Sequence, residues 1–271
     1  MKRLLHVSDL HFGRDRPELL PPLIDTINAL APDIVAISGD LTQRARASQF
    51  KQARDLIDSL QSPVLVVPGN HDTPLDNLPE RIFMPWRRYR KWISTDLEPQ
   101  VHDPEWSIIG INSVNPLGWQ RGWFDAKDIR TVEQGFADTP DSAFRIVVVH
   151  HPLEHLPGER KKLMRGADAA ISALARLGTD IVLSGHLHSW RADVFASAPT
   201  EPAVLQVHAG TGLSNRLRGQ ENDFNLLTLD GAMARIDRYV GRDVAHFHKE
   251  QSVVFERGET GWRAIEADNR P

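Results

Sequence analysis

Cysteine is absent from this chain of 271 residues. Disulfide bonds, zinc–thiolate sites and thiol nucleophiles are therefore excluded, and any metal ion must be held by nitrogen and oxygen ligands. Long apolar runs are absent too, because none approaches the about 18 residues that a membrane helix requires. The apolar stretch at residues 4–7 is also too short for the core of a signal peptide. These absences predict a cytoplasmic protein without a membrane partner.

An excess of positive charge is also missing, since the formal net charge at pH 7 is −4. Bulk electrostatics therefore do not favour an anionic membrane, and a nucleic acid polymer is not expected as a partner. Hydrophobic residues make up 41% of the chain, which is enough for one large core. We expect a single domain over residues 1–271, and the sequence leaves open whether copies form a homo-oligomer.

Strand-like and helical segments alternate through the first part of the chain. The strand-like segments cover residues 4–7, 34–37 and 64–67, the helical ones residues 18–30 and 48–60, and two later strands residues 145–149 and 181–183. This spacing predicts parallel strands joined by right-handed crossovers. Ligands of open α/β sheets bind at the carboxyl ends of such strands.

A polar motif follows each of these strands. The motifs are Asp9-Leu10-His11, Gly39-Asp40, Gly69-Asn70-His71-Asp72, His150-His151-Pro152 and Gly185-His186-Leu187-His188. Taken singly, each would more often be a turn or a cap. As an ordered set at strand ends they indicate a metal centre, with Asp9, His11, Asp40, Asn70, His150, His186 and His188 as candidate ligands.

The spacing of these residues suits two metal ions. Side chains at i and i+2 of an extended segment point the same way, so Asp9 and His11 would face one ion, and His186 and His188 have the same spacing. Asp40 stands alone at its strand end, and its two oxygens are suited to bridging both ions. A shell of nitrogen and oxygen fits Mn, Fe, Zn, Co or Ni better than Mg or Ca.

Two such ions would supply the nucleophile for hydrolysis of a phosphate ester. Held roughly 3.5–4 Å apart, they can bridge and deprotonate a water molecule and stabilise the attacking and leaving oxygens. The motifs bring no arginine beside the ligands except Arg216 and Arg218. This scarcity favours a monoanionic diester over a dianionic monoester as the substrate.

Two regions outside the motifs carry separate predictions. Residues 73–100 are predicted to form a loop and a short helix near the site, which we describe as a lid segment. Within it, residues 86–92 are rich in arginine and tryptophan; they form either a helix that packs its aromatic rings inward or a lid that meets an anionic, ring-bearing substrate. The short strands of residues 190–265 predict a second, mainly antiparallel sheet.

The ordered motifs resemble those of the calcineurin-like metallophosphoesterase superfamily over residues 1 to about 190. The later run Ala209-Gly210-Thr211-Gly212-Leu213-Ser214, with Arg216, Arg218, Asn222 and Phe224-Asn225, looks like the bacterial branch of class III cyclic-nucleotide phosphodiesterases and glycerophosphodiesterases. The resemblance implies an α/β fold, a four-layer α/β/β/α sandwich.

The resemblance also implies a role for each site residue. One metal would be held by Asp9, His11, Asp40 and His188, and the other by Asp40, Asn70, His150 and His186. His71 would be a catalytic helper beside the leaving group, steered by Asp72 or another acid. Asp72, His151, Arg216 and Arg218 would support the ligands or contact the substrate.

We therefore expect a dinuclear metal-dependent phosphodiesterase that uses Mn, Fe, Zn or Co ions and a metal-bridging hydroxide. Its substrates would be small organic phosphodiesters, either cyclic nucleotides or glycerophosphodiesters. The alternatives are a nuclease, or a phosphatase acting on phosphoproteins or phosphomonoesters, from the same superfamily. A non-catalytic scaffold is less well supported, because such a protein should have lost metal ligands and this chain retains them all.

Overall fold

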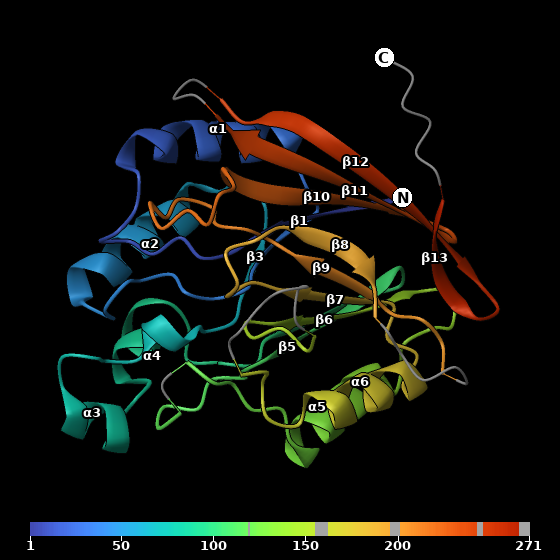
Figure 1. The fold of residues 1–271 in the computed structure, drawn as a ribbon, viewed down its shortest axis with the longest axis horizontal. Coiled ribbons are helices and arrows are strands. Elements are labelled where there is room, and N and C mark those ends of the chain that lie inside the picture. The colour runs from blue at the N-terminus through green and yellow to red at the C-terminus, as the bar shows by residue number, and fades with distance from the viewer. Residues whose placement is uncertain (119, 155–161, 196–200, 243–245, 266–271) are drawn as a thin grey trace.

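Two β-sheets pack face to face and helices cover both outer faces, which confirms the four-layer α/β/β/α arrangement (Figure 1). The computed structural model describes residues 1–118, 120–154, 162–195, 201–242 and 246–265. None of the helices in these ranges combines the length and apolar composition needed to span a lipid bilayer.

The first sheet has seven strands in the order β13-β12-β11-β10-β1-β2-β3. Its parallel part consists of β1 (Lys2–Val7), β2 (Ile34–Ile37) and β3 (Val64–Val66), joined through η1 (Pro17–Leu19), α1 (Leu20–Leu30) and α2 (Ala47–Ser59). Its antiparallel part consists of β10 (Asn222–Asp230), β11 (Met233–Gly241), β12 (His248–Gly258) and β13 (Gly261–Ile265). The predicted parallel crossovers are confirmed for β1, β2 and β3.

The second sheet has six strands in the order β4-β5-β6-β7-β9-β8. The strands are β4 (Gln100–Asp103), β5 (Trp106–Ile111), β6 (Phe144–Val149), β7 (Ile181–Ser184), β8 (Arg191–Val194) and β9 (Leu205–His208). Its outer face is covered by α5 (Ala126–Phe136) and α6 (Ala167–Arg176), at the bottom of Figure 1. The strands β5, β6, β7 and β9 run parallel, so their carboxyl ends lie at one edge.

Our prediction that residues 190–265 build the second sheet is wrong for most of that region. Only β8 and β9 belong to it, whereas β10 to β13 extend the first sheet. The reason is the open edge of β1, whose buried backbone groups need partners on the side opposite β2. The strand β10 supplies them, with pairs from Lys2↔Leu229 to His6↔Asn225. Residues 196–200 and 243–245 of the predicted region lie outside the described residues.

Alternate residues of the central strands enter two different apolar cores. On β1, Leu4 packs into the core between the sheets, whereas Leu5 and Val7 pack beneath α1 and α2. On β6, Ile146 faces the core between the sheets and Val147 faces α5 and α6. Parallel strands buried on both faces read as continuous apolar runs, as these do.

The segment of residues 73–100 contains two short helices, α3 (Leu78–Phe83) and α4 (Arg87–Trp92). Tyr89 of α4 is fully buried and donates a hydrogen bond from its hydroxyl to the carbonyl oxygen of Val66 (3.3 Å). Trp86 and Trp92 pack against the same core, next to α2. Of the two interpretations of residues 86–92, inward packing therefore describes their aromatic rings.

We expect Tyr89→Ala to lower the free energy of unfolding by roughly 3–5 kcal/mol, because a large buried ring is replaced by a cavity. Urea denaturation of the wild type and the variant measures this change. Arg90→Ala is the matched control, since Arg90 lies on the same helix and is exposed. A loss below about 1 kcal/mol for Tyr89→Ala would mean that α4 contributes little to the core.

Candidate metal centre

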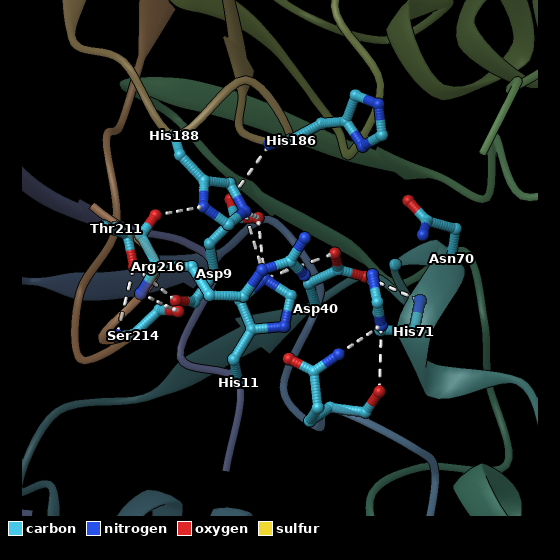
Figure 2. A network of polar contacts seen from close by, with 12 residues as sticks. Asp9, His11, Asp40, Asn70, His71, His186, His188, Thr211, Ser214 and Arg216 are labelled. Carbon is cyan, nitrogen blue, oxygen red and sulfur yellow. Dashed lines mark hydrogen bonds and ion pairs between the residues drawn. The ribbon is translucent and has the colours of Figure 1, made fainter. Parts of the chain in front are cut away.

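Five strands of the two sheets each end just before a candidate ligand. In the first sheet β1 leads to Asp9 and His11, β2 to Asp40, and β3 to Asn70. In the second sheet β6 leads to His150 and β7 to His186 and His188. All seven side chains are buried. Figure 2 shows most of them turned toward a common centre between the two sheets.

The backbone of this centre is left-handed at most of the candidate ligands. Positive φ angles occur at Asp9 (54°), His11 (49°), Asp40 (52°), His186 (71°) and His188 (56°), and otherwise, among described non-glycine residues, only at Ala31 and Ala45. This conformation is uncommon for residues with a β-carbon and concentrates at functional sites. Our expectation that the Asp-x-His and His-x-His pairs are extended is therefore wrong, because the chain coils back after each strand.

A close approach between two loops sets the position of Asp40. Gly39 has a φ of 90°, and a β-carbon there would lie 2.7 Å from the backbone nitrogen of Gly69. Glycine is needed at this contact because it accepts both the left-handed conformation and the short distance. The backbone N–H of His71 then donates to Oδ1 of Asp40 (2.8 Å). The loops after β2 and β3 thus hold one oxygen of this carboxylate in place.

The first group of candidate ligands consists of Asp9, His11 and His188, with Asp40 beside them. Nε2 of His188 lies 3.1 Å from Oδ1 of Asp9, and Nε2 of His11 lies 3.4 Å from the same oxygen. The two histidine Nε2 atoms are 3.1 Å apart. The structure thus brings together the four residues predicted for one metal ion.

The second group is formed by Asn70, His150 and His186 around the other side of Asp40. Nε2 of His150 lies 3.2 Å from Oδ1 of Asn70 and 3.4 Å from Oδ2 of Asp40. The ring of His186 lies 5.2 Å from that of His150 between centroids, on the side away from His11 in Figure 2. Ligand atoms of His150, His151 and His186 also lie within 4.8 Å of one another.

The carboxylate of Asp40 lies between these two groups. Its Oδ2 is 3.6 Å from Nε2 of His11 and 3.4 Å from Nε2 of His150. Because Oδ1 already accepts a hydrogen bond from the backbone N–H of His71, Oδ2 is the oxygen that faces both groups. This geometry is what a bridging ligand requires, and the assignment of each residue to an ion stays a prediction.

The charges within the centre are strongly coupled. Burial opposes ionisation of Asp9 and Asp40, but the neighbouring histidines outweigh it and hold the pKa of both carboxyls well below the ordinary value. Burial likewise opposes protonation of His150, but Asp40 and Asp9 outweigh it and raise its pKa to about 9. The two carboxylates therefore stay ionised and demand positive charge close by.

The donor set fits a metal ion. Oδ2 of Asp9 accepts hydrogen bonds from the Ser8 hydroxyl and the His186 backbone, whereas Oδ1 is buried without a hydrogen bond and faces His11 and His188. A buried carboxylate oxygen without a hydrogen bond is costly unless a cation satisfies it. Imidazole and carboxylate together suit a transition-metal ion.

His71 lies beside the candidate ligands, at the edge of the cleft. Its Nδ1 donates to the backbone carbonyl of Gln43 (2.8 Å), which leaves Nε2 without a hydrogen-bond partner in the described part of the chain. Burial is the main cause that lowers the pKa of His71. Its ring also lies edge-on to His11, 4.9 Å away between centroids. The residue therefore stands beside the ligands and lines the open cleft next to them.

Our expectation that Asp72 or another acid orients His71 is wrong, because the Gln43 carbonyl orients it. The Asp72 carboxylate instead accepts hydrogen bonds from the backbone N–H groups of Leu41, Thr42 and Gly69. Burial, reinforced by Asp40, raises the pKa of Asp72 to about 7. Asp72 thus ties the loop after β2 to the loop after β3 and does not face the cleft.

The remaining predicted residues are His151, Arg216 and Arg218, and they differ in whether they contact the site. His151 is buried next to the ligands, with Nδ1 2.8 Å from the Ser113 hydroxyl. Arg216 lines the cleft together with His71, and its backbone carbonyl accepts a hydrogen bond from Nδ1 of His188 (3.1 Å). Arg218 is exposed and is not among the described residues that line that cleft.

The site also includes the late turn at Thr211, which the sequence singled out, and three arginines that the sequence analysis missed. Thr211 donates from its hydroxyl to the backbone carbonyl of Asp9 (2.8 Å), and so fastens the late turn to the first motif (Figure 2). Arg14, Arg44 and Arg46 line the cleft with Arg216. Their spacing was a usable signal, because they lie within six residues after the ligands His11 and Asp40.

Comparison with known proteins gives one match to a protein family and several to individual proteins. Residues 2–190 match the family described as calcineurin-like phosphoesterase. The chain is 26% identical over 168 residues to the glycerophosphodiester phosphodiesterase GpdQ of Enterobacter lignolyticus. This match covers 55% of this chain and 57% of that protein. It is 23% identical over 205 residues to the 3′,5′-cyclic adenosine monophosphate phosphodiesterase CpdA of Escherichia coli K12, with 69% of each chain covered.

A solved structure supports the fold alone. The purple acid phosphatase PPD1 from yellow lupin seeds superimposes with a TM-score of 0.67 at 15% identity, over 95% of this chain and 54% of that one.

The family match spans all five polar motifs, and it therefore includes every candidate ligand.

We predict that the protein binds two metal ions per chain and that Asp40→Ala lowers the metal content and abolishes hydrolysis, because its carboxylate faces both ligand groups. Metal analysis after saturation and dialysis measures the content. The exposed Asp25→Ala is the matched control and should keep both ions. Saturation of the wild type at one ion per chain, with full activity, would contradict the prediction.

Proposed function

Since the chain belongs to the calcineurin-like phosphoesterase family, we propose that it is a hydrolase of small organic phosphodiesters that works with two metal ions. The observation that carries this proposal is the position of Asp40, whose Oδ2 faces both histidine groups. Cyclic nucleotides and glycerophosphodiesters are the candidate substrates, since proteins named for each activity are similar to this chain at low identity. Manganese, iron, zinc or cobalt would suit the ligands.

When bound, the two ions would neutralise the phosphate and lower the pKa of a water molecule that attacks phosphorus. The protein contributes the geometry. Asp9, His11 and His188 would hold one ion, and Asn70, His150 and His186 the other, with Asp40 shared between them. Because the rigid strand ends position these side chains before substrate arrives, little reorganisation is needed during reaction.

We propose that His71 acts on the leaving group. Its Nδ1–H is engaged by the Gln43 carbonyl, so Nε2 is the atom left to exchange a proton or a hydrogen bond with substrate in the cleft. The neighbouring Asn70 is a candidate ligand and lines the same cleft.

The arginines of the cleft change the argument about charge. The expected scarcity of arginine near the motifs is wrong, because Arg14, Arg44, Arg46 and Arg216 all line the cleft. Charge therefore does not favour a monoanionic diester, and the preference for diesters rests on the named relatives. The same arginines also weaken the case against a nuclease, which rests on the negative net charge and on the absence of a long basic domain.

We expect the catalytic efficiency for bis-para-nitrophenyl phosphate to exceed that for para-nitrophenyl phosphate by about tenfold or more under one metal. Both substrates release the same chromophore, so the comparison isolates the second ester group. Enzyme stripped with a chelator is the control and should be inactive on both until metal is restored. Equal or faster turnover of the monoester would reject the diesterase proposal in favour of a phosphatase.

His71→Ala should lower turnover by on the order of 10²–10⁴ for a diester with an alkyl leaving group, because a positioned acid or base typically contributes that much. The loss should be smallest for a para-nitrophenyl leaving group, which needs little protonation. Both metal ions should remain bound. His102→Ala, at an exposed histidine on β4, is the matched control. Loss of a metal ion, or no loss of rate, would show that the role assigned to His71 is wrong.

A further inference from the structure

The cleft beside the candidate metal centre is rich in arginine. It has a volume of about 690 Å³, and the residues that line it include Arg14, Arg44, Arg46, Arg216, His71 and Leu75. Leu75 is the single apolar side chain among these described residues, and no aspartate or glutamate is among them. A cavity of this volume suits a small organic ligand of nucleotide size.

The loops after β1 and β2 are joined at this cleft. The backbone N–H of Gln43 donates to the carbonyl of Phe12 (3.0 Å), next to a bridge between Phe12 and Thr42. Gly13 has a φ of 95°, and a β-carbon there would lie 2.0 Å from Nε2 of the Gln49 side chain. The loop that carries Arg14 is therefore packed directly against the start of α2.

The buried side chain of Gln49 also shapes the loop that carries Arg44 and Arg46. Its Oε1 accepts hydrogen bonds from the backbone N–H groups of Arg44 (2.9 Å) and Arg46 (3.3 Å). Between them, Ala45 is buried in a left-handed conformation and its N–H donates to the Thr42 hydroxyl (2.9 Å). The two arginines are consequently turned outward while the backbone that carries them is fixed.

The fourth arginine is attached to the same framework. The backbone N–H of Asn215 donates to the carbonyl of Arg14 (2.8 Å), and Asp15 and Ser214 form a β-bridge. Arg216 follows directly, and Figure 2 shows its side chain beside His11. Three loops linked by backbone hydrogen bonds thus place four guanidinium groups around one cavity.

No described carboxylate neutralises these four guanidinium groups. In the described ranges no carboxylate forms an ion pair with Arg14, Arg44, Arg46 or Arg216. By contrast, the neighbouring Arg87 and Arg88 outside the cleft both pair with Glu80. Clustered arginines without counter-ions repel one another, so their placement indicates an anionic ligand.

We propose that this arginine cleft binds a second phosphate group of the substrate, so that the natural substrate is a small phosphodiester bearing a further ionised phosphate. The proposal rests on the proposed diesterase function. When bound, the metal ions would already compensate the charge of the scissile phosphate, and four additional cations exceed what a monoanionic diester needs. Guanidinium groups bind phosphate through paired hydrogen bonds, so a phosphate suits them better than a single hydroxyl.

The test compares two chromogenic diesters that differ by one phosphate. They are thymidine 5′-(para-nitrophenyl phosphate) and the same compound carrying a 3′-phosphate, and water cleaves the same P–O(aryl) bond in both. We expect the 3′-phosphorylated compound to have a catalytic efficiency about 10- to 100-fold higher, mainly through a lower KM, because charge-assisted hydrogen bonds are strong. Equal efficiencies for the two compounds would overturn the proposal while leaving the diesterase function intact.

Variants of the arginines separate charge from folding. In Arg44→Ala/Arg46→Ala the preference for the phosphorylated compound should fall toward unity. In Arg44→Lys/Arg46→Lys only part of it should return, because lysine keeps the charge but not the paired hydrogen bonds. Arg130→Ala is the matched control, since Arg130 is exposed on α5 outside the cleft. It should leave both activities and their ratio unchanged. A preference that persists in the double alanine variant would overturn the proposal.

A binding measurement covers the case in which neither diester is hydrolysed. Calorimetry of the metal-loaded wild type should show thymidine 3′,5′-bisphosphate binding at least about tenfold more tightly than thymidine 5′-monophosphate. Equal affinity would overturn the proposal, whereas hydrolysis of para-nitrophenyl phosphate alone would reject the diesterase function instead. Faster cleavage of a thymidine octanucleotide than of the phosphorylated monomer would also overturn it, by assigning the arginines to a polymer.

Discussion

The carboxylate of Asp40 is the constraint around which the rest of the site is arranged. It is buried and ionised between His11 on one side and His150 on the other. A buried charge of this kind is tolerated only where cations and hydrogen-bond donors surround it. The close contact of Gly39 with Gly69, the N–H of His71 and the left-handed turn at Asp40 all serve to deliver those donors. Disturbing any of them would leave the charge uncompensated.

The loops that carry the ligands also build the wall of the cleft. The loop after β1 bears His11 and then Arg14, and the loop after β2 bears Asp40 and then Arg44. Backbone hydrogen bonds join these loops to each other and to the turn at Ser214. One framework of loops therefore carries both the candidate metal ligands and the arginines of the proposed phosphate site.

The strands after residue 190 illustrate the limit of pattern reading. Their alternation correctly marked β-structure, but it could not reveal that β10 pairs with the edge of β1, because periodicity identifies buried faces and carries no information about edges. Likewise Asp72 was identified as an acid next to His71, yet its carboxylate turns to the backbone of Leu41 and Gly69. Adjacent residues in a short 3₁₀ turn point in different directions, and only the fold decides which.

The resemblance of the motifs to a known family implied the sandwich class, whereas the sequence by itself determined the parallel strands β1, β2 and β3 and the ordered motifs whose residues cluster at the strand ends. These follow from local patterns, since apolar periodicity and motif order survive in one dimension. Tertiary structure alone decided that Asp40 faces both groups, that Gln43 orients His71, and that Arg14, Arg44, Arg46 and Arg216 surround one cavity. These depend on contacts between segments distant along the chain and on left-handed turns that residues other than glycine adopt only when their surroundings impose them.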